Sequence, residues 1–133
     1  MNDDYFFITP VTTDQFFTYV GGLRLLTEIN HIHHVPSQKS NAWLASVCNI
    51  VILTDKTYGG EHVHSFHKHA PCFYSRLAFE EVHQKLAKVL DITLPDQMRN
   101  PDDFNMPLLH HNYMQEEGSK KLDIPVQLNP LIE

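Results

Sequence analysis

The sequence predicts a small α+β protein, and three observations lead to this class. At 133 residues the chain suits one domain with one modest core. Aromatic and β-branched runs near its start and middle are typical of short strands. The stretch that begins at Pro71 has apolar residues at the three- and four-residue intervals of a helix. Together these patterns favour a few strands combined with one long helix.

The first part of the chain predicts a strand followed by a helix. The run DYFFIT, residues 4–9, is aromatic and β-branched and stops at Pro10. Thr12-Thr13-Asp14-Gln15 has the spacing of a capping box, and apolar residues follow it at helical intervals, so we expect a helix near 13–21. The Gly21-Gly22 pair leaves a second interpretation open, a hairpin turn between apolar runs.

The middle of the chain predicts a strand, a loop and a second strand. Leu23–Val35 lacks a clean helical stripe and is expected to be extended, ending at a group of histidines. Residues 36–46 are expected to form a polar loop or a short helical piece around Trp43 and Leu44, and Val47–Thr54 is rich in β-branched residues, which favours a buried strand. A single helix from Ser40 to Asp55 is the competing interpretation.

The rest of the chain predicts one helix and a tail. After a connection rich in glycine and histidine, the apolar stripe places a helix near 71–91. Residues 92–133 contain repeated prolines among polar residues and are expected to form an extended, Pro-rich acidic tail. We therefore predict one compact domain over 1–91, with a core unit at about 28–90.

Charge and composition restrict the partners and the location. The net charge is −6, but residues 31–90 carry six Lys and Arg against four Asp and Glu, so this section alone is mildly basic. Acidic flanks around such a centre allow a nucleic-acid site there and make strong non-specific binding unfavourable. No apolar run is long enough to span a membrane and the N-terminus is acidic, which predicts a cytoplasmic protein without a membrane partner. Cys48 and Cys72 are expected to be free thiols.

Ten histidines in 133 residues indicate a chemical role for some of them. Neighbouring side chains on a strand point to opposite faces, so His33 can face a metal ion while His34 faces an attacking water molecule. Asn49 can orient that base or anchor the loop, because its amide both donates and accepts hydrogen bonds. Further metal ligands are available in EHVHSFHKH, which contains His62, His64, His67 and His69. His62 and His64 share a face if the segment is extended, whereas His64 and His67 share one if it is helical.

This arrangement resembles a known family. His33-His34-Val35, a polar loop, Asn49 to Thr54, then Val63-His64 and an amphipathic helix are similar to the HNH nucleases of the ββα-metal, or His-Me finger, class. The likeness is greatest to the short forms without zinc-binding cysteines that are common in bacteriophage genomes. It covers roughly residues 28–90.

The resemblance implies a function and a set of roles. It implies an endonuclease that hydrolyses DNA with a divalent ion, magnesium in the first place and zinc or manganese as alternatives. His34 is then the general base, Asn49 the central asparagine, and His33 a metal ligand together with His62 or His64. If the gene is carried by a phage, the protein acts in the cytoplasm of a bacterial host.

The remaining expectations concern binding and the competing function. Lys39, Lys56 and Lys68 are candidate phosphate contacts, and the tail can support a homodimer. The alternative to an enzyme is a catalytically inactive interaction or inhibitor protein with a structural or vestigial metal site. His83, His110 and His111 are interpreted as ordinary polar residues with satisfied hydrogen bonds, His83 facing solvent, and Trp43, Phe73 and Phe79 as core residues.

Overall fold

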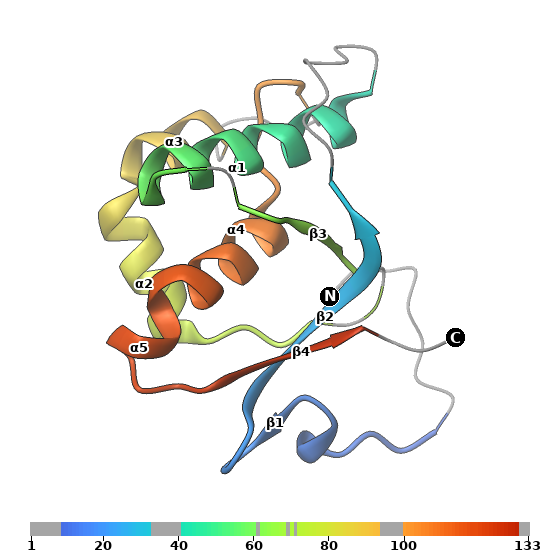
Figure 1. Ribbon diagram of the computed structural model, residues 1–133. Coiled ribbons are helices and arrows are strands. Elements are labelled where there is room, and N and C mark those ends of the chain that lie inside the picture. The colour runs from blue at the N-terminus through green and yellow to red at the C-terminus, as the bar shows by residue number, and fades with distance from the viewer. Residues whose placement is uncertain are drawn as a thin grey trace.

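A computed structural model describes residues 9–32, 41–60, 62–68, 70, 72–93 and 100–130. Its helices and strands follow one another as shown in Figure 1. Their bounds are, in chain order, η1 Thr13–Gln15, β1 Phe17–Thr18, β2 Gly22–His31, α1 Ala42–Tyr58, β3 Ser65–His67, α2 Arg76–Lys85, α3 Ala87–Thr93, α4 Met106–Tyr113, the π-helical turn η2 Met114–Gly118, α5 Ser119–Lys121 and β4 Val126–Pro130. The predicted α+β class is confirmed.

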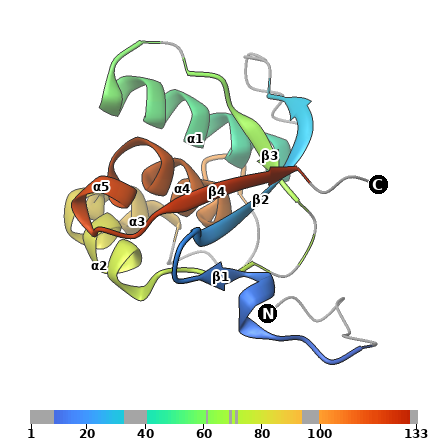
Figure 2. The same cartoon turned by 60° about the horizontal axis from the view of Figure 1, so that its bottom comes forward.

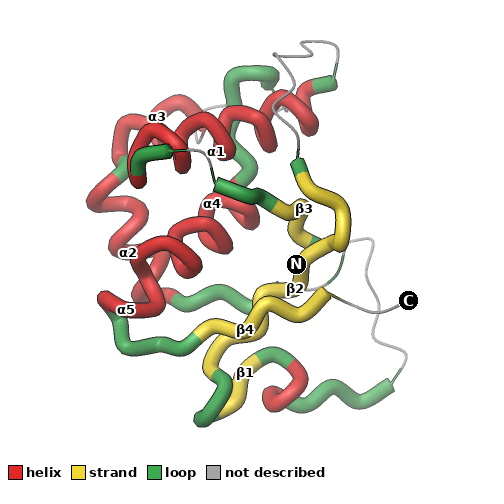
Figure 3. Tube along the Cα trace, viewed as in Figure 1, coloured by secondary structure: helices red, strands yellow, loops and turns green. Residues whose placement is uncertain are grey.

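The sheet is built around β2. Strands β1 and β3 pair with it in antiparallel fashion and β4 pairs with it in parallel. The helices gather on one side of this sheet, while the hairpin of β1 and β2 extends to the far end of the molecule (Figures 1 and 3). Turned by 60°, β4 runs in front of β2 and α4 lies behind it (Figure 2).

One hydrophobic core joins β2 to three helices. Its buried members come from β2 and the residue after it, from α1, α2 and α4, and from the start of η2. They lie on both sides of position 91, the predicted end of the compact domain. They are Leu23, Leu25, Ile32, Val47, Ile50, Val51, Ala78, Val82, Leu108, Leu109, Tyr113 and Met114. None of the helices in the described part of the chain combines the length and the apolar character needed to cross a bilayer.

The second strand predicted for the middle of the chain is wrong, and the competing helix is confirmed. Residues 47–54 lie inside α1, which begins after Asn41, whose Oδ1 accepts a hydrogen bond from the Leu44 N–H at 3.2 Å. Val47, Ile50, Val51 and Thr54 are spaced three and four residues apart, so a helix buries all of them on one face. Burial of that face outweighs the strand preference of β-branched residues. The ββα finger therefore does not form.

The N-terminal helix is also wrong, because the chain forms the alternative hairpin there. Only Thr13–Gln15 is helical, as a short 3₁₀ turn, and Gly22 takes a φ of +71° where β1 turns into β2. A side chain on Gly22 would meet the Pro125 carbonyl oxygen, so glycine is required at this position. The predicted strand at residues 4–9 lies outside the described residues except for Thr9.

The long helix is shorter than predicted, and the predicted tail contains helices. The helix near 71–91 is largely confirmed, although it begins at Arg76 after the cap Ser75 and breaks at Leu86 into α2 and α3. Residues 106–121 are helical rather than extended. Asn105 caps α4 by accepting from the Leu108 N–H, and the apolar face of α4 enters the core, which holds this part of the chain in place.

Candidate functional site

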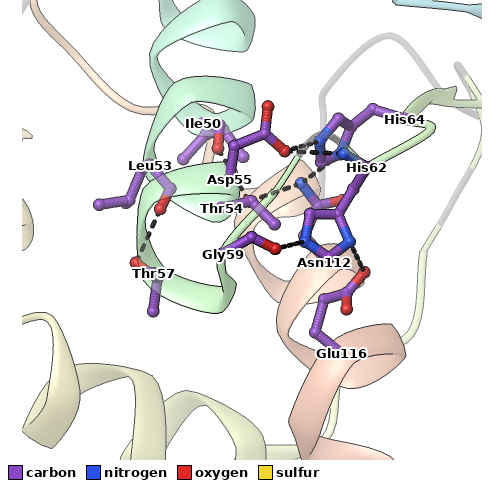
Figure 4. A network of polar contacts seen from close by, with 10 residues as sticks. All are labelled: Ile50, Leu53, Thr54, Asp55, Thr57, Gly59, His62, His64, Asn112 and Glu116. Carbon is purple, nitrogen blue, oxygen red and sulfur yellow. Dashed lines mark hydrogen bonds and ion pairs between the residues drawn. The ribbon is translucent and has the colours of Figure 1, made fainter.

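The candidate site is a network of polar side chains where α1, the segment before β3, and α4 with η2 meet. Figure 4 shows how these side chains point toward one another. We call this group the polar network, and its members are Thr54, Asp55, His62, His64, Asn112 and Glu116.

His64 lies at the centre of the polar network and is only 5% exposed. Its Nε2 lies 3.0 Å from Asp55 Oδ1, and its Nδ1 lies 3.3 Å from the Asn112 side-chain nitrogen. An amide nitrogen can only donate, so Nδ1 is the acceptor and Nε2–H donates to the carboxylate. The second amide hydrogen of Asn112 donates to Thr54 Oγ1 at 3.0 Å. The imidazole of His64 therefore has both of its nitrogens bonded.

His62 is held more openly at the rim of the same network. Its Nδ1 lies 3.2 Å from Glu116 Oε1, its Nε2 lies 3.2 Å from the Gly59 carbonyl oxygen, and its backbone N–H donates to Asp55 Oδ1 at 3.1 Å. These contacts tie the end of α1 to η2. A π-helical turn is often found at functional sites, and here it directs Glu116 toward His62.

A second group of histidines is buried at the other side of α4. His110 and His111 are 0% and 2% exposed. His110 Nε2 accepts a hydrogen bond from the Ser75 N–H at 3.0 Å, and its ring stacks on Phe79. His111 Nδ1 donates to the Pro107 carbonyl oxygen at 2.8 Å. Among the described residues, His110 Nδ1 and His111 Nε2 have no hydrogen-bond partner.

Burial determines the charge of this pair. It lowers the pKa of His110 to about 3, and the neighbouring His111 lowers it further. Burial also lowers the pKa of His111 to about 4, although the bond to Pro107 acts in the opposite direction. Both imidazoles are therefore neutral at neutral pH. Residues His110, His111 and Asn112 were not among the predicted site residues.

Three of the predicted site residues, His33, His34 and Lys39, lie outside the described residues. Asn49 lies on α1, where its side-chain nitrogen donates to the backbone oxygens of Pro101 at 3.0 Å and Asp103 at 2.8 Å. It therefore anchors a distant segment of backbone.

The structure describes two of the three lysines predicted to contact phosphate, Lys56 and Lys68. Lys56 is in the last turn of α1, and Lys68 Nζ lies 3.6 Å from Glu28 Oε2. The role of both lysines in phosphate binding stays a prediction.

The predicted metal ligands His62 and His64 do lie close together, with ring centroids 6.1 Å apart. Each of them, however, contacts a carboxylate instead of leaving a nitrogen open for an ion. Across the described ranges, no three His, Cys, Asp or Glu side chains are arranged to hold a metal. The prediction that these two histidines bind a metal gains no support from their partners.

The comparisons with known proteins give one family. The model of Stealth protein CR3, conserved region 3, matches residues 68–116, which are 49 of the 133 residues. The comparison with curated proteins gives no match. The family that matches is not a nuclease family, so the resemblance to HNH nucleases is wrong. The histidine and asparagine pattern that suggested it is divided between the undescribed residues, α1 and the segment before β3.

A sequence signal for the buried histidines was present. Asn105 followed by Pro107 is a typical start of a helix, and Leu109 and Tyr113 are four residues apart. His110 and His111 lie buried inside that helix, where each has one bonded ring nitrogen and one without a partner among the described residues. His83, by contrast, is exposed on α2 as expected.

Proposed function

We propose that this chain is part of a Stealth-type transferase that acts on a sugar substrate of the kind used in capsule formation. The observation that carries the proposal is the match over residues 68–116. This proposal replaces the prediction of a DNA endonuclease, with its hydrolase and bacteriophage assignments, which the match contradicts. It also replaces the alternative of an inactive interaction protein.

The matched residues form a connected structural unit, which supports the proposal. The Ser75 N–H at the start of α2 donates to His110 on α4, so the two ends of the matched stretch are joined directly. The match ends at Glu116, which pairs with His62 of the polar network. A conserved region that closes on itself in this way can hold its side chains in fixed relative positions.

Asn49 connects this unit to the rest of the chain. It binds the backbone of Pro101 and Asp103 inside the matched stretch, and the Asn105 N–H donates to the Ser46 carbonyl oxygen at 3.3 Å. In the proposed transferase Asn49 is therefore a positioning residue. It acts through the backbone between α3 and α4.

A divalent cation, with magnesium first, belongs to the proposal because Stealth proteins generally depend on one. The described side chains that could bind it are hydrogen bonded to one another and do not form a ligand set. The proposal therefore assigns the ion no residue and no step.

The test is a transfer assay on the purified chain. Sugars activated as nucleotide derivatives are offered with oligosaccharide acceptors, in the presence of magnesium, manganese or a chelator, and labelled product is measured. We expect product that depends on the cation. We also expect Asn49→Ala to reduce the rate by roughly tenfold, as for a misplaced site, while Ile52→Ala on the exposed side of the same helix leaves it unchanged. The absence of product with every donor and cation would contradict the proposal.

A further inference from the structure

The turn between β1 and β2 exposes apolar side chains to an unusual degree. Tyr19 and Val20 are 99% and 94% exposed, and Phe17, which precedes them on β1, is half-exposed. The Tyr19 ring contacts Phe17 edge-on, with centroids 6.2 Å apart. Single exposed apolar residues are common, but three of them gathered at one turn indicate a contact surface.

This turn is held firmly at its base. The Gly21 N–H donates to Thr18 Oγ1 at 2.9 Å, and the Leu23 N–H donates to the Pro125 carbonyl oxygen at 2.8 Å. Gly22 at φ +71° lies so close to Pro125 that a Cβ atom would not fit. The exposed side chains are therefore presented on a fixed backbone, which lowers the entropy cost of binding.

The shape and position of the turn indicate what it contacts. It lies at the end of the molecule away from α1 and α3 (Figure 1), and the near-complete exposure of both tip residues means that no described segment of the chain surrounds them. A convex tip offers no groove in which a peptide could lie, whereas its apolar side chains can insert into a lipid bilayer. Tyrosine, with an apolar ring and a polar hydroxyl, is favoured at the boundary between lipid and water.

We propose that the β1–β2 turn inserts Tyr19 and Val20 into the interfacial layer of a phospholipid bilayer. This inference is independent of the proposed transferase activity. The charged residues of the hairpin are Arg24 and Glu28, with Asp14 just before it, and they form no basic patch. The chain as a whole carries −6. Binding is therefore driven by apolar insertion, and anionic lipid does not strengthen it.

The test is flotation of the whole chain with vesicles of phosphatidylcholine, and of phosphatidylcholine with phosphatidylglycerol. We expect the chain to float with both, and no better with the anionic vesicles. Tyr19→Ser combined with Val20→Ser should lower the partition coefficient by roughly tenfold or more, as the loss of two apolar contacts implies. Val63→Ser, which changes another strongly exposed apolar residue, is the matched control and should bind like the unaltered chain.

Three results would overturn this inference. The first is that the unaltered chain floats with neither kind of vesicle, in which case the tip serves a protein partner or none. The second is that the tip variant, shown by circular dichroism to be folded, floats as well as the unaltered chain. The third is binding only to anionic vesicles, because that result assigns the contact to charge.

Discussion

The two histidine pairs of this protein show how differently one residue type can be used. His62 and His64 lie on an irregular segment and contact the carboxylates of Glu116 and Asp55. His110 and His111 lie on a helix inside the core, where each has one bonded and one unbonded nitrogen. The first pair is stabilised by polar partners. The second pair is kept neutral by burial, and its unbonded nitrogens are a cost to the fold.

The largest difference between the pairs should appear on acidification. The pKa values of His110 and His111 lie at about 3 and about 4 in the folded state, below the usual value near 6.5. At a pH between the folded-state and the usual pKa values, the unfolded chain binds more protons than the folded chain. The free energy of unfolding therefore falls as the pH drops from about 6.5 toward 3. At about 1.4 kcal/mol per unit the total loss is several kcal/mol. Urea unfolding at about pH 7 and pH 4.5 measures it.

A double variant separates this effect from the titration of carboxylates. His110→Phe with His111→Leu removes both buried imidazoles and keeps apolar rings and chains of similar size in the core. We expect this variant to lose much less stability over the same pH interval. An equal loss in both proteins would show that the buried pair does not control acid unfolding.

A smaller effect is expected from breaking the polar network at its buried centre. Asn112→Ala removes both donors, which leaves His64 Nδ1 and Thr54 Oγ1 without them. Two buried acceptors without donors should lower the free energy of unfolding by about 2–4 kcal/mol. Asn30→Ala, at an exposed position on β2, is the control and should change it by less than about 0.5 kcal/mol. If both variants lost a similar amount of unfolding free energy, Asn112 would have no special structural role.

The packing of η2, the turn that carries Glu116, can be tested at Gly118. A Cβ atom on Gly118 would lie 2.6 Å from the Tyr113 ring and 2.9 Å from Met114 Sδ. Gly118→Ala should therefore destabilise the fold by about 1–3 kcal/mol, as overpacking does, despite the better helix propensity of alanine. Thermal unfolding would show this, with Ser119→Ala as the neighbouring control. A variant more stable than the unaltered chain would mean that η2 adjusts freely.

The smallest effect belongs to the rim of the network. His62 and Glu116 are partly exposed, so solvent screens their interaction. His62→Ala should reduce the free energy of unfolding by about 1 kcal/mol or less, and added salt should make the difference smaller still. A loss as large as that of Asn112→Ala would mean that His62 has a structural role equal to that of the buried centre.

Local patterns determined part of the fold. The apolar stripe after Pro71 predicted α2 and α3, and the run that begins at Leu23 predicted β2. The spacing of Val47, Ile50, Val51 and Thr54 fits a helix, but their β-branched side chains also fit a strand, so periodicity over so short a run left both open. The choice between them depends on which elements are available to cover the buried face.

The site was harder to predict than the fold. The spacing of His62 and His64 predicts that they act together, and they do belong to one network, but their partners are Glu116 and Asp55 on two other elements. The sequence pattern predicts a catalytic role for Asn49, whereas its amide binds backbone more than fifty residues away. The predicted roles in binding DNA and in forming a homodimer stay predictions.

The sequence by itself determined the α+β class, the strand β2, the helical stretch after Pro71 and the exposure of His83, because each depends on residues close together in the chain. Only the tertiary structure decided that the predicted tail returns as α4 to complete the core, and that His110 and His111 are neutral there. Burial and partners come from contacts between distant segments, and these contacts set both the protonation state and the hydrogen bonds of a side chain.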